Sequence, residues 1–132
     1  MIALDTNVLV RYLVEDDARQ TALASALIAR AIAEGDALFV SEVVVCETVW
    51  VLTAAYRFER AAVAGVLREL LRARHLTFGS HEQLSRALTA YAAGRGDFAD
   101  YLSREQARVA GFGQVATFDK ALHREPGFIP VR

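Results

Sequence analysis

The stretch Met1-Ile-Ala-Leu-Asp-Thr-Asn-Val-Leu-Val-Arg-Tyr12 opens the chain and decides which fold the rest of the sequence must fit. Residues 2–4 form a short apolar run that predicts a buried strand, and three short polar residues separate this run from a second apolar run beginning at Val8. This pattern is typical of a strand-to-helix turn. Ligands of open α/β sheets bind outside the carboxyl ends of strands, so Asp5 would lie at the functional edge. The alternative is that Asp5 or Asn7 only caps the following helix.

The size and composition favour one compact domain spanning residues 1–132, because 54% of the 132 residues are hydrophobic. No apolar run approaches the roughly 20 residues of a membrane span, and the first residues lack the features of a signal peptide. We therefore expect a cytoplasmic protein without a membrane segment. Cys46 is the single cysteine, which excludes an intrachain disulfide and a cysteine zinc site.

The formal net charge of -1 shows no global basic excess of the kind that marks many nucleic-acid-binding proteins. This balance weakens a nucleic-acid interpretation without excluding it, since a small active site needs only a few local cations. Acids that a bound metal would neutralise also enter the charge count.

Short apolar segments alternate with longer segments of helical periodicity along the whole chain. The segments that predict strands are residues 2–4, 38–40, 76–78, 115–118 and 128–131. Helices are expected between them, with Asp16 or Asp17, Ser41 and Asp97 as N-caps and Gly35 as a terminator. Strands separated by helices predict an α/β fold with a mostly parallel, doubly wound sheet.

Glu47 is the only charged residue between Val43 and Leu52, in a run that we assign to a helix. Burial of an unpaired carboxylate costs about several kcal/mol, so a buried Glu47 would need a proton or a cation. The alternative is that Glu47 lies on an exposed edge of the helix or pairs with an arginine.

Three further acids fall where strands end or helices begin. Asp97 and Asp100 are three residues apart, so both point to one face at the positively polarised start of a helix. Asp119 follows directly on an apolar strand, as Asp5 does, and the two would share a sheet edge if their strands are parallel. Helix capping is the simpler explanation for Asp97 with Asp100, and a turn role is equally common for an aspartate such as Asp119.

Convergence of the acids would require a cation. Two unit charges about 5 Å apart repel by roughly 3 kcal/mol at an effective dielectric constant near 20, and four charges form six such pairs. Ligation by oxygen alone favours Mg²⁺ or Mn²⁺, which can activate water and stabilise the charge of phosphodiester hydrolysis. The predicted catalytic and metal-binding set is Asp5, Glu47, Asp100 and Asp119.

Neutral and cationic side chains accompany these acids in the sequence. Groups suited to orienting carboxylates or water are Thr6, Asn7 and Thr117. Cations beside the proposed acids, which could contact backbone phosphates, are Arg11, Arg95 and Lys120. Each of these cations could equally be a salt-bridge partner.

Four motifs in this order resemble the PIN-domain ribonucleases: Asp5-Thr6-Asn7, an acid in an apolar helix at position 47, Asp97-Phe-Ala-Asp100-Tyr-Leu, and Thr117-Phe-Asp119-Lys. The small single-domain format is similar to that of the VapC toxins of toxin–antitoxin pairs. The resemblance covers nearly the whole chain. It implies a three-layer α/β/α fold with about five strands, a Mg²⁺ or Mn²⁺ site, endonucleolytic cleavage of RNA, a VapB-type antitoxin and a homodimeric toxin.

The resemblance also assigns roles by position. Asp5 matches the family's first acid, Glu47 the helix acid, Asp119 the last acid, and Asp100 the third because an apolar pair follows it. Asp97 is then a cap or a supporting acid. The chain departs from the family pattern at residues 103–106, which are more polar than the usual run of small residues.

Two other function classes fit parts of the sequence. A receiver-like phospho-acceptor domain would also place acids and a lysine at strand ends, but it needs an aspartate after the third strand, where this chain has Phe78-Gly79-Ser80. A non-catalytic PIN-like module that binds RNA or protein would keep the fold without cutting. Labelling by acetyl phosphate would support the former, and binding without metal-dependent cleavage the latter.

Overall fold

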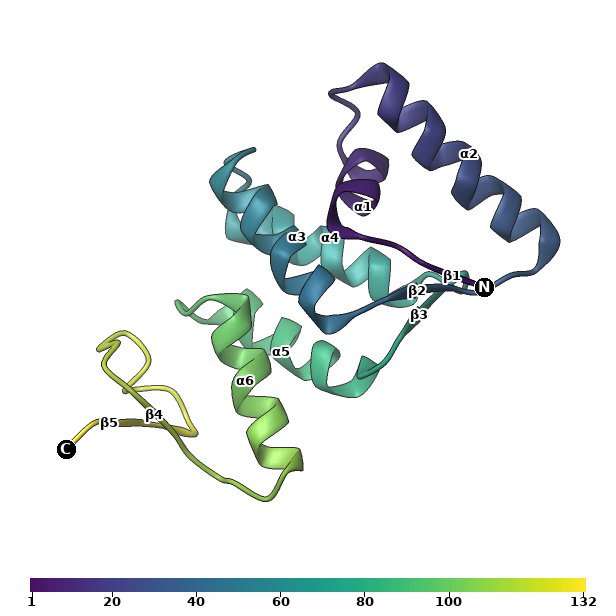
Figure 1. The fold of residues 1–132 in the computed structure, drawn as a ribbon. Helices are drawn as coiled ribbons and strands as arrows, with labels where there is room; N and C mark the ends of the chain where they lie inside the picture. Colours follow the sequence, from purple (N-terminus) through teal and green to yellow (C-terminus); the bar gives the residue numbers. More distant parts are fainter. The chain divides into compact units, whose positions relative to one another are not determined.

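The computed structural model describes residues 1–132 and divides them into two compact units, Met1–Ser80 and His81–Arg132. Figure 1 traces the elements of both units in chain order. None of the helices combines the length and the apolar character that a membrane span requires.

The first unit contains a three-stranded parallel sheet with the order β1-β2-β3. Its strands are β1 (Ile2–Ala3), β2 (Leu38–Val40) and β3 (Leu76–Phe78). Leu38 is in register with Ile2 on one side and with Leu76 on the other. The predicted parallel pairing is therefore confirmed for these strands, with β2 in the centre.

Four helices connect and cover these strands: α1 (Thr6–Leu13), α2 (Ala18–Glu34), α3 (Glu42–Ala54) and α4 (Arg60–Arg72). Asp17 and Ser41 cap α2 and α3 by accepting backbone N–H groups of Gln20 and Val44, as expected from their short polar side chains. Gly35 ends α2 in the left-handed conformation that glycine adopts readily. In Figure 1, α1 lies between α2 and α3.

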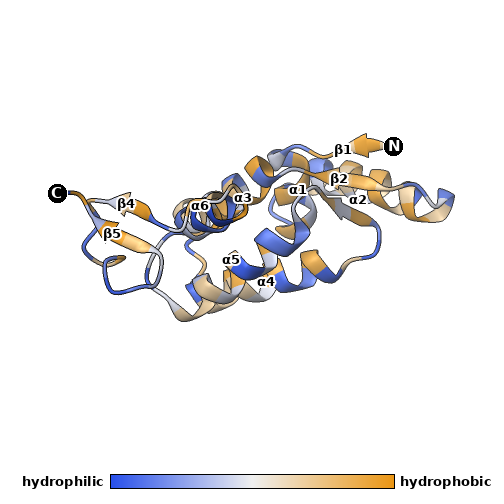
Figure 2. Ribbon diagram, turned by 90° about the horizontal axis from the view of Figure 1, so that it is seen from below, coloured by the Kyte–Doolittle hydropathy of each residue, from blue (hydrophilic) through white to orange (hydrophobic).

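The core of the first unit is formed by aliphatic residues from each helix and from β2. Fully buried members are Leu9, Ile28, Leu38, Val40, Leu52, Val63 and Leu67. The prediction of a buried first strand is wrong for Ile2 and Ala3, which are exposed although Figure 2 shows β1 as hydrophobic. The reason is that β1 is a two-residue strand at the edge of the sheet, so only Leu4 reaches the core.

The second unit consists of two helices and a two-stranded parallel sheet. Its elements are α5 (His81–Ala93), α6 (Phe98–Val109), β4 (Val115–Thr117) and β5 (Phe128–Pro130). Phe98, Tyr101 and Leu122 are buried in its core, and the ring of Tyr91 packs edge-on against Phe98 at 6.0 Å.

The five predicted strands all form and the α/β class is confirmed, but the strands lie in two sheets of three and two instead of one sheet. The expected burial of residues 115–118 is wrong. Ala116 is exposed and Phe118 is 83% exposed, because the two-stranded sheet of the second unit leaves these side chains uncovered within that unit.

Candidate functional site

Asp5 stands at the junction of β1 and α1, as the opening stretch predicts. Its Oδ1 accepts the backbone N–H of Val8 at 3.0 Å, so Asp5 is the N-cap of α1. No hydrogen bond is made by its Oδ2, and the residue is exposed. Thr6 and Asn7 form the first turn, half-buried and exposed respectively. Capping therefore uses one oxygen of Asp5 and leaves the other available to a ligand.

Glu47 lies on α3 as predicted, but the premise that it is buried is wrong. It is exposed on the same face as Val43, which is 65% exposed, and Trp50, which is 68% exposed. The opposite face of α3 supplies the buried residues Val45, Val49 and Leu52. Glu47 is therefore a solvent-accessible carboxylate on an otherwise apolar helix face.

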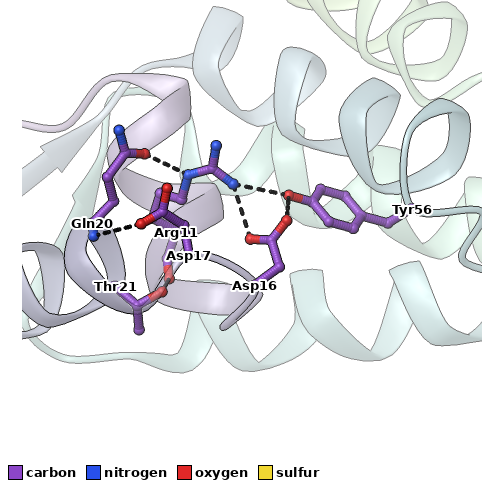
Figure 3. A network of polar contacts seen from close by, with 6 residues as sticks. All are labelled: Arg11, Asp16, Asp17, Gln20, Thr21 and Tyr56. Atoms are coloured by element: carbon purple, nitrogen blue, oxygen red, sulfur yellow. Dashed lines mark hydrogen bonds and ion pairs between the residues drawn. The ribbon is translucent and has the colours of Figure 1, made fainter.

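Arg11 takes part in a polar network that joins α1 to its surroundings (Figure 3). Its guanidinium donates to Asp16 at 2.9 Å, to the hydroxyl of Tyr56 at 3.1 Å and to Gln20 at 2.6 Å. The hydroxyl of Tyr56 donates to Asp16 at 2.6 Å, and this hydrogen bond is the main cause that lowers the pKa of the Asp16 carboxyl. Arg11 thus has the structural role that the sequence left open as an alternative to phosphate contact.

In the second unit, Asp97 and Asp100 lie together at the start of α6. The backbone N–H of Asp97 donates to Oδ2 of Asp100 at 3.1 Å, which fixes the orientation of that carboxylate. Burial raises the pKa of Asp100, and the negative charges of Asp97, Asp119 and Glu125 raise it further, although the hydrogen bond from Asp97 opposes them. Negative charge is therefore concentrated around Asp100.

Asp119 follows β4 in a tight turn held by its own neighbours. Its N–H donates to Oγ1 of Thr117 at 3.0 Å, and its Oδ1 accepts the N–H of Ala121 at 3.0 Å. Asp119 is exposed, and its charge acts on Asp100. The turn thus leaves Oδ2 of Asp119 without a hydrogen bond, and Thr117 accepts the backbone N–H of Asp119.

Arg95 and Lys120, the other predicted phosphate contacts, line one pocket of the second unit together with Arg124 and Glu125. Sequence analysis missed the last two. A signal was present, because Arg124 follows Lys120 by four residues, the spacing of neighbours on one helical face.

Glu105 is a third residue that was not predicted from the sequence. It is a buried carboxylate on α6, held by Arg104 at 3.3 Å and by Arg108 at 3.2 Å. Arg104 also donates to the carbonyl of Pro126 at 3.0 Å and lies over the rings of Tyr101 and Phe128. Arg104, one of the polar residues after Leu102, therefore connects α6 to the segment before β5. This contact explains why a polar residue stands there in place of the family's small residues.

The donor chemistry of the predicted acids fits Mg²⁺ or Mn²⁺, since carboxylate oxygens are the ligands these ions prefer. Burial, and then the charges of Asp97, Asp119 and Glu125, raise the pKa of Asp100, and a nearby cation would lower the cost of its ionised form. Neither unit by itself holds three or more His, Cys, Asp or Glu side chains arranged to bind a metal ion. Asp5 and Glu47 belong to the first unit, and Asp97, Asp100 and Asp119 to the second.

The profile of one protein family, the PIN domain, matches residues 2–127 and so includes all of these acids. The chain belongs to the PIN-domain family. PIN domains are generally nucleases, and those nucleases typically use Mg²⁺ or Mn²⁺. The matched range includes residues of both units. No curated protein matches the chain.

Proposed function

We propose that this PIN domain is a Mg²⁺- or Mn²⁺-dependent endoribonuclease. The observation that carries the proposal is the concentration of negative charge at Asp100, where burial and three neighbouring carboxylates raise its pKa. A folded chain tolerates such a cluster best when a divalent cation neutralises it. Membership of a nuclease family supplies the reaction class.

In this proposal Asp5, Glu47, Asp100 and Asp119 hold the ion. The bound ion would supply a polarised phosphate and a water of lowered pKa. The chain's own groups orient these ligands. Asp97 fixes Asp100 through its N–H, Thr117 holds the turn of Asp119, and the cap at Val8 holds Asp5.

The supporting polar residues contribute to substrate placement. Thr6 and Asn7, beside Asp5, are available to hydrogen-bond water or ribose hydroxyls. Arg95 and Lys120 line a pocket in which they can meet phosphate oxygens, whereas Arg11 is held by Asp16 and Tyr56. We assign phosphate contact to the first two cations and a structural role to Arg11.

The toxin role is part of the same proposal. We assign the chain as the toxin of a VapBC-type pair, active as a homodimer and neutralised by a VapB-type antitoxin, and its membership of the PIN family, which often occurs in VapC toxins, supports this assignment. Expression of the chain alone should arrest bacterial growth, and co-expression of the product of a short neighbouring reading frame should relieve the arrest. Growth unaffected by the chain when it is well expressed would contradict the toxin role.

The enzymatic claim is tested with Asp5→Asn on end-labelled RNA. Asparagine also caps helices well, so the variant should fold, while the loss of one negative ligand should reduce Mg²⁺-dependent cleavage by at least about 100-fold. Asp36→Asn is the matched control, because Asp36 is an exposed acid of the same unit outside the proposed site. Cleavage by Asp5→Asn at the wild-type rate would remove Asp5 from the mechanism.

The two other function classes are separated by the same assay. Family membership disfavours the receiver, as does the missing aspartate after β3. A non-catalytic module would bind RNA with and without Mg²⁺ but leave it uncut.

A further inference from the structure

A pocket of about 600 Å³ opens on the surface of the second unit, between the loop that follows α5 and the turn that follows β4. Three cations line it, Arg95 from the loop and Lys120 and Arg124 from the turn, together with the single carboxylate of Glu125. The pocket lies wholly within the second unit. Its charge and construction together point to a ligand.

The walls of the pocket are fixed by a close approach of loop and turn. The hydroxyl of Tyr101, beneath them, accepts the N–H of Gly96 at 2.9 Å and donates to Glu125 at 2.6 to 2.7 Å. A Cβ atom at position 94 would overlap this hydroxyl and lie 2.7 Å from Oε1 of Glu125. Glycine at position 94 is therefore what allows the loop to lie against the turn.

The turn itself presents its cations outward. Backbone hydrogen bonds from Leu122 to Asp119, from His123 to Lys120 and from Glu125 to Leu122 wind it tightly. Leu122 is 1% exposed and anchors the turn from below, where a Cβ atom at position 96 would lie 2.5 Å from its Cδ2. Lys120 and Arg124 are both exposed at the pocket.

The three cations of the pocket differ from the arginines on the helices of this unit in forming no ion pair with an acid. Arg86, Arg104 and Arg108 each form an ion pair on α5 or α6. Arg95, Lys120 and Arg124 form none, and the carboxylate of Glu125 is hydrogen-bonded to Tyr101. Like charges gathered in this way repel one another, so an anion that enters the pocket is favoured.

We propose that this pocket binds the sugar-phosphate backbone of single-stranded RNA and holds a phosphate next to the one that is cut. The proposal rests on the proposed endoribonuclease function. Arginine forks and a lysine suit phosphate oxygens, and a volume of about 600 Å³ accommodates a nucleotide. Lys120 directly follows the proposed catalytic acid Asp119, and Arg95 precedes the supporting acid Asp97 by two residues, so the bound phosphate would lie beside Asp119. An acidic peptide would also be attracted by the positive charge, but it gives no reason for the cations to lie next to a proposed catalytic acid.

The test is the affinity of the full chain for a fluorescent single-stranded RNA, measured by anisotropy in EDTA so that no cleavage occurs. Arg124→Gln and Lys120→Gln should each weaken binding by about 3- to 10-fold, because each removes one phosphate contact. The double variant should reduce the slope of log affinity against log salt by about 1.4, at about 0.7 for each phosphate lost. Circular dichroism confirms that the variants are folded.

Arg86→Gln is the matched control, since it removes the same charge from the same unit but pairs with Glu82 outside the pocket. An equal loss of affinity in Arg86→Gln and Arg124→Gln would overturn the pocket, as would an unchanged salt slope in the double variant. If a poly-glutamate peptide competes as strongly as RNA of equal charge, the pocket's ligand is an acidic protein and not RNA.

Binding in EDTA separates this proposal from the nuclease proposal. If Arg124→Gln loses affinity for RNA but the wild type shows no Mg²⁺-dependent cleavage, the pocket proposal stands and the nuclease proposal fails. If the wild type cleaves RNA but Arg124→Gln binds it with unchanged affinity, the nuclease proposal stands and the pocket proposal fails.

Discussion

Asp100 is a residue of the second unit whose ionised form is disfavoured by burial and by neighbouring charges. Its pKa is raised by burial and by the charges of Asp97, Asp119 and Glu125, so the folded chain binds this proton more tightly than the unfolded chain does. At low pH both states are protonated and no penalty arises. As the pH rises past the unfolded pKa and then the folded pKa, the folded state loses stability, and the penalty is complete at neutral pH.

Asp100→Asn should therefore raise the melting temperature at pH 7 in EDTA, by about 2 to 5 °C on the scale usual for a chain of this size. The gain should shrink towards pH 3, where the wild-type carboxyl is protonated. Mg²⁺ should then stabilise the wild type more than the variant. Calorimetric scans across this pH range measure both effects, and equal Mg²⁺-induced shifts in the two proteins would place Asp100 outside the metal site.

Tyr101 has a separate structural role beneath the cationic pocket. Burial is the main cause that raises the pKa of its hydroxyl, and the hydrogen bond to Glu125 adds to it, so the group stays a donor. Tyr101→Phe would leave the buried N–H of Gly96 without its acceptor and Glu125 without its donor, at a cost of about 1 to 3 kcal/mol. Urea unfolding measures this loss. Tyr12→Phe, at a half-buried tyrosine without a hydrogen bond, should cost much less.

Among the elements, α6 depends on a buried ion-pair network that its helical pattern does not reveal. Glu105→Gln would leave Arg104 and Arg108 without their shared partner, and we expect a loss of about 3 kcal/mol, at the low end for a buried pair because Arg108 is half-exposed. Glu82→Gln, which breaks the exposed pair with Arg86, should cost at most about 0.5 kcal/mol. Denaturant unfolding of the two variants should therefore differ clearly. Equal losses would mean that the network on α6 contributes no more than a surface pair.

Local signals predicted these elements well. Asp17, Ser41 and Gly35 mark helix ends through contacts within a few residues, and the structure confirms all three. Glu47 shows the limit of such signals. Because α3 is apolar nearly all round, its sequence does not reveal which face is buried, and the structure exposes the face that carries Glu47.

At the scale of the whole molecule, properties that depend on distant partners were predicted less well. The burial of β1 and β4 depends on which strands lie beside them, and a run such as Ile2–Leu4 does not specify its neighbours. The pocket at Arg124 likewise depends on the approach of two loops that Gly94 permits. The order of the acids along the chain was nevertheless enough to suggest the PIN family, which the match over residues 2–127 confirms.

The central proposal is that Asp5 and Asp119 are ligands of a divalent ion. Titration calorimetry with Mn²⁺ on wild type, Asp5→Asn and Asp119→Asn tests it most directly, because each variant removes one proposed ligand from a different unit. We predict that both variants bind Mn²⁺ at least about tenfold more weakly than wild type, since even the partners of metal ligands contribute that much. Wild-type affinity for Mn²⁺ in either variant would contradict the account.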